Sequence, residues 1–251
     1  MGNQDFFYER KKGLLLTPEG EAIVQHAERV IERERQIQER LEAQDGVVRG
    51  TLKIACASIV AQMWLPRVLK EFIKAYPDVH ISVVTGWSSE IHQALVDGSA
   101  HVGIVRGNIA WKSVHKPLFQ DKLFLVDKEI NRLEDVLDSE RPFIQFQSDS
   151  NYYQVIQDYW QRNYGKMPRQ AMVMDQIETC RQMAFNGIGF AILPEVTLMD
   201  ASDDIHKIPL VDKTGEILSR DTSLIGYEQS LALPQVKAFL GIVDKYLESH
   251  N

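Results

Sequence analysis

Short apolar runs alternate with longer helical patterns from residue 51 onward, and this alternation constrains the fold more than any other feature of the sequence. Thr51–Ala57, Val79–Thr85 and His101–Val105 have the composition and length of buried strands. Helical patterns begin at Ser58 and Ser88. Strands that alternate with helices form right-handed βαβ units. The sequence therefore predicts an α/β fold with a mostly parallel sheet.

The second half of the chain keeps alternating, but its pattern changes. A strand at 118–126 is expected to cross from one part of the fold to another. A helix stop at Gly187 precedes a buried strand that ends at Pro194. The number of expected strands and helices suggests two subdomains of about a hundred residues each. The other expected elements are strands at 142–146, 171–174 and 222–227 and helices at 152–164, 176–185 and 234–247.

The first fifty residues have a different character. Three consecutive basic residues precede a turn and an apolar triplet within residues 6–17, which indicates a short hairpin or wing. A helix is expected to begin after Thr17, because threonine is a favoured N-cap and Pro18 occupies the first helical position. No helix breaker follows before Asp45, so we expect one helix over residues 18–46.

The expected helix carries a narrow apolar seam between charged flanks. Its apolar residues recur in two columns with heptad spacing, a pattern typical of two-helix pairing, and Glu34 interrupts the second column. Either the helix pairs with the same helix of a second copy, or it packs on its own domain as a surface helix. The seam residues are Ile23, Ala27, Val30, Ile37 and Leu41.

The charge balance limits the possible partners. The chain has 251 residues and a formal net charge of −7, with a pI near 5.5. Proteins that bind phosphate backbones usually carry a basic patch and a high pI, so composition alone argues against strong nucleic-acid binding. The first fifty residues and the remainder are both mildly acidic.

Cysteine usage and the N-terminal residues indicate where the protein works. Cys56 and Cys180 have no CxxC neighbour, which favours a reducing compartment. The N-terminal residues lack the basic and apolar regions of a signal peptide, and no apolar run approaches the roughly 18 residues of a membrane span. We expect a soluble cytoplasmic protein that does not contact membranes.

Polar residues follow the expected strands at the positions where a ligand would bind. In open parallel sheets, ligands occupy the crevice beyond the carboxyl ends of the strands. One aromatic side chain and one guanidinium in this set suit a small anionic organic molecule. Structural alternatives are a helix N-cap for Ser58, a packing role for Trp87 and a surface salt bridge for Arg106. The strand-end residues are Ser58, Thr85, Gly86, Trp87, Arg106, Gly107, Gln147, Ser148, Asp175 and Gln176.

Catalytic and cofactor-binding motifs are absent from the sequence. No G-x-S-x-G, H-E-x-x-H or P-loop pattern occurs, and the seven histidines show no metal-ligand spacing. Gly187 and Gly189 lack the third glycine of a dinucleotide loop and follow a helical pattern. We therefore expect no enzymatic activity, no cofactor and no metal.

Several dispersed motifs resemble those of LysR-type transcriptional regulators. Phe6–Gly20 is similar to the wing and linker-helix start of that family, with an apolar pair, an Arg, a basic turn and L-T-x-x-G. Trp64–Pro66 and Leu95–Val105 resemble the first regulatory subdomain. Phe185–Pro194 resembles the G-x-G-x-x-x-L-P stretch of the second.

The resemblance implies an architecture and a function. It implies two Rossmann-like subdomains of the periplasmic-binding-protein type, preceded by a wing remnant (1–17) and a linker helix (18–46). Residues 50–119 and 221–251 would form regulatory subdomain I, and residues 120–220 would form subdomain II. A small effector would bind between them and control DNA-dependent transcription, in a homodimer or homotetramer.

The chain departs from the family pattern at its start. Because the wing is reached within about ten residues, we expect both helices of the helix-turn-helix, and the base readout they provide, to be missing. DNA binding is then expected of an intact regulator and is expected to be weak or absent in this chain. The residues expected to contact DNA phosphates are Arg10, Lys11, Lys12 and Thr17.

Two other classes of protein stay open on sequence alone. A transporter-type solute-binding protein shares the two-subdomain cleft, although the expected lack of a signal peptide and the long charged helix disfavour it. An enzyme with a cleft site, such as a deaminase or lyase, has no residue set in its favour, but analogy of fold does not exclude it.

Overall fold

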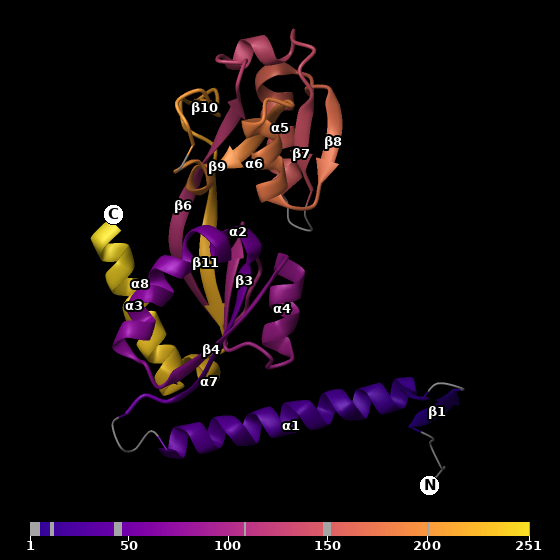
Figure 1. Ribbon diagram of the computed structural model, residues 1–251, viewed down its shortest axis with the longest axis vertical. Helices are drawn as coiled ribbons and strands as arrows, with labels where there is room; N and C mark the ends of the chain where they lie inside the picture. The colour runs from indigo at the N-terminus through magenta and orange to yellow at the C-terminus, as the bar shows by residue number, and fades with distance from the viewer. Residues whose placement is uncertain are drawn as a thin grey trace.

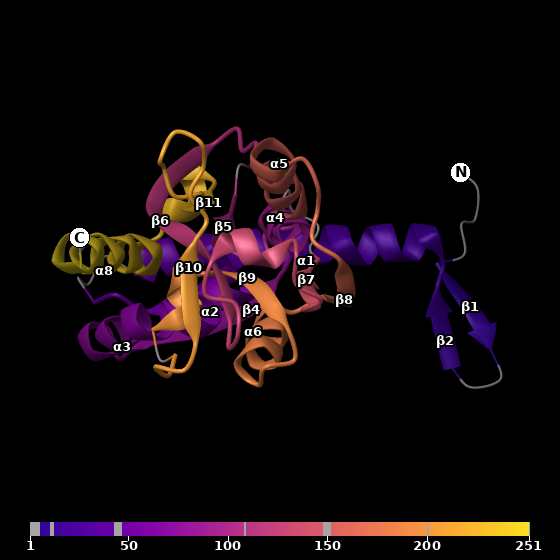
Figure 2. The ribbon, with the colours of Figure 1, turned by 90° about the horizontal axis from the view of Figure 1, so that it is seen from above.

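The computed structural model describes residues 6–10, 13–42, 47–107, 109–147, 152–199 and 201–250. Two lobes are stacked along the long axis of the molecule, and one long helix lies across the end of the first lobe (Figure 1). Seen from above, this helix extends beyond the lobes toward the N-terminal hairpin (Figure 2). Two strands join the lobes.

The N-terminal hairpin and the long helix form as predicted. β1 (Phe7–Arg10) pairs antiparallel with β2 (Gly13–Leu16), and α1 covers Pro18–Glu42. The hydroxyl oxygen of Thr17 accepts a hydrogen bond of 3.0 Å from the N–H of Gly20. This bond satisfies one of the free N–H groups of the first helical turn, which confirms Thr17 as the helix cap.

The glycine of the L-T-x-x-G pattern has a steric reason. A Cβ atom at Gly20 would lie 2.3 Å from the carbonyl oxygen of Phe6. The same carbonyl accepts a hydrogen bond of 3.0 Å from the N–H of Thr17, so the start of the hairpin is fixed against the start of the helix. The last residues of the expected helix, 43–46, lie outside the described part of the chain.

The first lobe contains a parallel three-stranded unit surrounded by helices. β3 (Gly50–Ala57) lies between β4 (Val79–Gly86) and β5 (Val102–Arg106) and pairs parallel with both. The predicted first helical stretch is split at Trp64, because Pro66 takes a place in the first turn of a new helix. The helices of this lobe are α2 (Ser58–Met63), α3 (Leu65–Ala75), α4 (Ser88–Val96), α7 (Glu228–Leu231) and α8 (Pro234–His250).

The second lobe repeats this plan. β7 (Phe143–Phe146) pairs parallel with β8 (Gln170–Met174) and with β9 (Phe190–Pro194). Gly187 has a φ of 73°, as expected after the end of a helix. The other elements are α5 (Tyr152–Tyr164), α6 (Ile177–Phe185), β10 (His206–Pro209) and the 3-10 helices η2 (Leu133–Val136) and η3 (Glu195–Leu198). The sequence pattern missed β10, η2, η3 and α7, because each has only four residues that mix polar and apolar side chains, unlike the buried four-residue strand β7.

Two strands connect the lobes. β6 (Val114–Asp127) and β11 (Ser219–Gly226) pair antiparallel and run between the lobes (Figure 1). They join the parallel units into one nine-stranded sheet in the order β4-β3-β5-β11-β6-β9-β7-β8, with β10 paired to β6. The expectation of a parallel sheet is therefore confirmed within each lobe and is wrong around β6 and β11. The chain leaves the first lobe along β6 and returns along β11 in the opposite direction, so the pairs around these strands are antiparallel.

Each lobe has its own group of packed aromatic side chains. In the first lobe, the rings of Phe72 and Phe239 meet edge to face at 5.8 Å between centroids. In the second, Phe143 and Phe190 are stacked at 5.1 Å, and Trp160 is fully buried. Within the described ranges, no helix is long and apolar enough to cross a membrane.

Candidate functional site

Six of the predicted strand-end residues meet in one cavity between the two lobes. Ser58, Gly86, Trp87 and Arg106 line it from the first lobe, and Asp175 and Gln176 line it from the second. The cavity has a volume of about 60 Å³, which is room for only a few water molecules. The remaining lining residues are Ala57, Ile59, Gln62, Ser88, Phe146, Ile177, Glu178 and Arg220.

A more open hollow adjoins this cavity at the edge strand β4. It has a volume of about 410 Å³ and adds Thr85 and Glu90 to the lining. Ser58, Trp87 and Gln176 line both spaces, which we call together the cleft. A molecule of more than a few atoms fits only by extending into both spaces or by moving the lobes apart.

Arg106 is a buried cation of the cleft. It ends β5 and is only 5% exposed, so the alternative of a surface salt bridge is wrong. Its Nη2 donates a hydrogen bond of 2.9 Å to Oδ2 of Asp121, which is also buried. The Nε–H of Arg106 has no hydrogen-bond partner among the described residues. Because an unsatisfied buried donor costs free energy, an acceptor group of a bound molecule would be favoured here.

Arg106 belongs to a buried charge cluster with Asp121 and Arg220, which lie on β6 and β11. We call these two strands the hinge strands and the three side chains the hinge cluster. Asp121 on β6 faces Arg220 on β11 in the strand register. Nη2 of Arg220 donates to the carbonyl oxygen of Arg106 at 3.4 Å, and its guanidinium lies 4.8 Å from the ring centroid of Tyr152. Burial raises the pKa of Asp121, whereas Arg106 and the N–H of Val196 oppose this rise. The cluster contains two guanidiniums and one carboxylate, and the lining of the cleft adds the carboxylates of Asp175, Glu178 and Glu90. An anion in the cleft is therefore favoured by the buried guanidinium of Arg106 itself and not by the overall charge of the lining.

The strand-to-helix turn at residue 87 places an aromatic wall beside the cleft. The N–H of Trp87 donates a hydrogen bond of 2.6 Å to Oε2 of Glu90, and the Trp87 side chain is 39% exposed. A Cβ atom at Gly86 would lie 2.3 Å from the same Oε2, so only glycine leaves room for this bond. The indole is therefore presented to the cleft instead of being packed in the core.

The sequence rule placed some strand-end residues incorrectly. Ser58 is the first residue of α2, whose cap position is Ala57, so the N-cap interpretation of Ser58 is wrong. Phe146 takes the place that we expected for Gln147, which is exposed, because successive side chains of a strand point to opposite faces. Gly107, with a φ of 82°, does not line the cleft. Ser148 lies outside the described residues.

Five polar lining residues were missed by the sequence analysis, two of which, Ser88 and Glu90, lie in the first turn of α4. Gln62 and Glu178 lie inside helices α2 and α6, and the rule that we used considered only the ends of strands. Arg220 lies within β11, where six of eight residues are buried. No sequence signal marked Arg220, because the expected strand covered only residues 222–227 and the part of β11 around Arg220 is polar in sequence.

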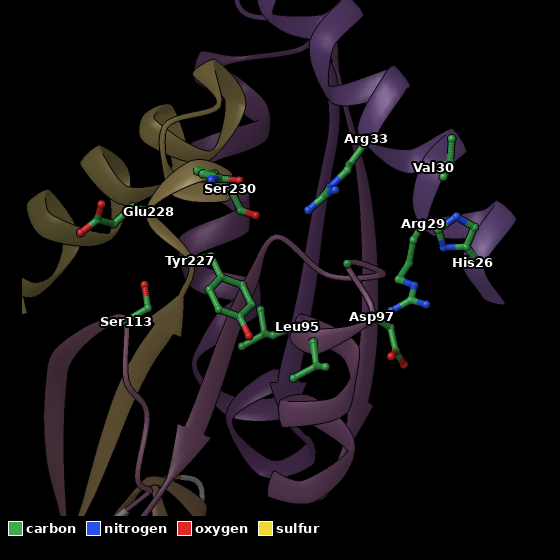
Figure 3. Close-up of a pocket in the computed structure, with 13 residues that line it drawn as sticks. His26, Arg29, Val30, Arg33, Leu95, Asp97, Ser113, Tyr227, Glu228 and Ser230 are labelled. Atoms are coloured by element: carbon green, nitrogen blue, oxygen red, sulfur yellow. The ribbon is translucent and has the colours of Figure 1, made fainter. Parts of the chain in front are cut away.

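A larger hollow lies between α1 and the first lobe. Its volume is about 610 Å³, and Figure 3 shows Arg33 reaching into it beside Tyr227, while Arg29 points toward Asp97. These cations stand on exposed positions of α1, whereas Arg106 in the cleft is buried. A buried cation attracts an anion with less screening by water, so we place the candidate site in the cleft.

The residues expected to contact DNA phosphates have mixed outcomes. Thr17 is 4% exposed and its hydroxyl oxygen caps α1, so we correct its role from phosphate contact to helix cap. Lys11 and Lys12 lie outside the described residues, and the side chain of Arg10 is also outside them. The structure therefore supplies no contact surface for phosphate from this set.

The expected dimer seam is exposed to solvent in this chain. Ile23, Val30 and Ile37 are 50%, 50% and 57% exposed, and Ala27 is exposed as well. The side chain of Leu41 lies outside the described part of the structure. The packing of α1 against its own lobe therefore leaves the described seam residues largely exposed to solvent.

Comparisons with known proteins identify the family. A family model described as the LysR substrate binding domain matches residues 45–248. The HTH-type transcriptional regulator YkuM of Bacillus subtilis (strain 168) is 47% identical over 245 residues, which are 98% of this chain and 83% of that protein.

Solved structures agree on the fold. A full-length OxyR variant from Pseudomonas aeruginosa has a TM-score of 0.69 at 16% identity and covers 97% of this chain and 80% of that one. The effector binding domain of QuiR in complex with shikimate has a TM-score of 0.65 at 15% identity and covers 80% and 99%. These findings favour a regulator over a transporter-type solute-binding protein. The chain therefore belongs to the LysR family of transcriptional regulators, with a substrate-binding domain over residues 45–248.

Proposed function

We propose that the cleft binds a small organic anion and that its occupancy controls transcription from DNA. The observation that carries this proposal is Arg106, a buried guanidinium in the cleft whose Nε–H has no partner among the described residues. Arg220 adds a second buried guanidinium. The QuiR domain, which has the same fold, was solved with shikimate, itself a small organic anion.

Around this site we propose the remaining parts of the regulator. Residues 50–119 and 221–251 form regulatory subdomain I, and residues 120–220 form subdomain II. The proposed boundaries fall within β6 and β11, where the chain passes between the lobes. The expected linker helix, residues 18–46, pairs with its counterpart to give a homodimer or homotetramer.

We further propose how the protein contacts DNA, where it is located and that it does not catalyse a reaction. Arg10, Lys11 and Lys12 are proposed to contact DNA phosphates in the assembled regulator. The relatives are named as transcriptional regulators, so we propose a cytoplasmic protein that is not an enzyme. Its only small-molecule reaction is then reversible binding.

A panel of small organic acids, screened by thermal shift, tests the binding proposal. At least one acid should raise the melting temperature of the wild-type chain. Arg106→Gln should remove most of that shift, and Ser58→Ala should reduce it, because both residues line the cleft. Arg132→Gln, on an exposed arginine of the second lobe, should keep the full shift. A full shift in both cleft variants would place the site elsewhere, and a panel without any hit would reject an anionic effector.

A further inference from the structure

Asp121 connects the cleft to a segment of the second lobe. Its Oδ2 accepts the hydrogen bond from Arg106, and its Oδ1 accepts a hydrogen bond of 3.1 Å from the N–H of Val196. Val196 lies in η3, the 3-10 helix that directly follows β9. One buried carboxylate therefore holds the cation of the cleft on one oxygen and the backbone of the second lobe on the other.

The segment held by Asp121 lies where the two lobes touch. η3 packs against β6 at the hinge and also against α2, the helix that begins with Ser58. Beyond η3, Met199 receives a contact of 3.4 Å from Nη2 of Arg67 on α3. A shift of η3 would therefore change how the second lobe rests on the first.

The carboxylate is not packed tightly on every side. Asp121, Glu195 and Val196 line a hollow of about 620 Å³ on the side of β6 and η3. The charged groups that act on Asp121 include Arg106, which favours its ionised form, and Glu195, which opposes it. The position of this carboxylate therefore depends on the attraction of Arg106, and space is available for it to move.

We propose that Asp121 is a positioning residue that transmits occupancy of the cleft to η3 and so to the packing of the lobes. The proposal rests on the proposed function, in which an anion binds Arg106. An anion at Arg106 competes with Asp121 for the guanidinium. Asp121, no longer held by the guanidinium, can then turn into the adjoining hollow, so its hydrogen bond from Val196 is lost and η3 is released from the hinge.

Removal of the arginine charge should have the same effect as an anion, so the proposal can be tested without a ligand. We expect Arg106→Gln to speed amide hydrogen exchange of Val196, measured residue by residue by NMR, about tenfold, the effect of weakening one charge-assisted hydrogen bond. In Asp121→Asn, the exchange of Val196 should already be faster. Adding Arg106→Gln to that variant should then change it little.

The second lobe supplies a matched control. Asp127 is fully buried, pairs with Arg141 and accepts a hydrogen bond of 3.1 Å from the N–H of Ile130. Arg141→Gln should speed exchange at Ile130 and leave Val196 unchanged, and Arg106→Gln should do the reverse. Equal acceleration at both amides would mean general destabilisation and would overturn the proposal, as would an unchanged Val196 in Arg106→Gln.

Inorganic phosphate serves as the probe anion in a second arm. It should speed exchange at Val196 in the wild-type chain and not in Asp121→Asn. Phosphate that shifts the melting temperature through Arg106 but leaves Val196 unchanged would overturn the coupling and keep the binding site. If phosphate and the organic acids all fail to bind, the proposed function fails, while the variants without ligand still decide the role of Asp121.

Discussion

At the scale of single residues, burial decides which polar groups have a function. Arg106 and Asp121 are both almost completely buried, and each uses its hydrogen bonds within the hinge cluster. Thr17 is buried as well, but its hydroxyl oxygen caps a helix and is not presented to a ligand. The same burial that makes Arg106 a strong candidate for anion binding thus removes Thr17 from the list of contacts.

Burial also controls the chemistry of the two cysteines. Both are free and 0% exposed, and burial raises the pKa of Cys180 to about 12 and that of Cys56 as well. The thiolate is the reactive form, so neither thiol should react with Ellman's reagent at pH 8 in the folded protein. Both should react after unfolding in urea, as measured by absorbance. A fast-reacting thiol in the native state would contradict the buried placement.

The same pKa shift gives a direction for stability. The unfolded chain releases its thiol protons near the ordinary pKa of cysteine, and the folded chain does so only at higher pH. The contribution of the thiols to the free energy of unfolding is therefore fully present at pH values below the ordinary pKa of cysteine. Their contribution falls as the pH rises toward 12, so unfolding by urea should become easier above about pH 9.

At the scale of elements, α1 is the part whose surface lacks a partner. Its described seam residues are about half exposed, and Ile31, outside the seam, is 65% exposed. A helix of 25 residues with so little burial gains little stability from packing on its own lobe. Pairing with a second helix would remove this apolar surface from water, which is the physical reason to expect a dimer.

Val30→Lys tests the pairing of α1. A charge placed in the seam must lose water on association, so the variant should dissociate at concentrations at which the wild-type chain is a dimer in sedimentation velocity. Gln25→Lys adds the same charge at an exposed position outside the seam and should leave the dimer intact. A wild-type monomer, or a Val30→Lys dimer of unchanged stability, would count against the seam.

At the scale of the whole molecule, the cleft exists because two strands hold two lobes face to face. β6 and β11 carry Asp121 and Arg220 of the hinge cluster; β11 pairs with β5 of the first lobe, and β6 pairs with β9 of the second. Ser58 and Asp175 line the cavity from opposite lobes. They lie far apart in the sequence, so only the arrangement of the lobes brings them to the same cavity. A ligand in the cleft must therefore act on both lobes, whereas a ligand in the hollow beside α1 would act on α1 and the first lobe.

Hydrogen exchange of the whole chain distinguishes these two sites. An organic acid that raises the melting temperature should slow exchange in α2 of the first lobe and in α6 of the second, since both helices line the cleft. Residues 26–33 and 227–230 should be unchanged. Protection of those two segments without protection of α6 would move the ligand to the hollow beside α1.

Local patterns predicted most elements of this fold. The Thr17-Pro18 start of α1, the helix end at Gly187 and the buried strands follow from capping, backbone conformation and hydrophobic periodicity, all of which act over a few residues. Short elements of mixed polar and apolar residues, such as η3, were missed because they contain too few positions to show a period, whereas the largely apolar strand β7 was predicted. The antiparallel direction of β6 and β11 escaped because strand direction depends on how the chain returns, which no local pattern records.

The sequence by itself determined the alternation of strands and helices, the seam of α1 and the polar strand ends from which the cleft is built. Only the tertiary structure decided that Arg106 is buried against Asp121, that Arg220 joins them from a distant strand, and that Val196 is held by the same carboxylate. The physical reason is the separation along the chain of the residues that each effect involves. Periodicity and capping are properties of neighbours in sequence, whereas burial and charge pairing depend on which strands the fold brings together.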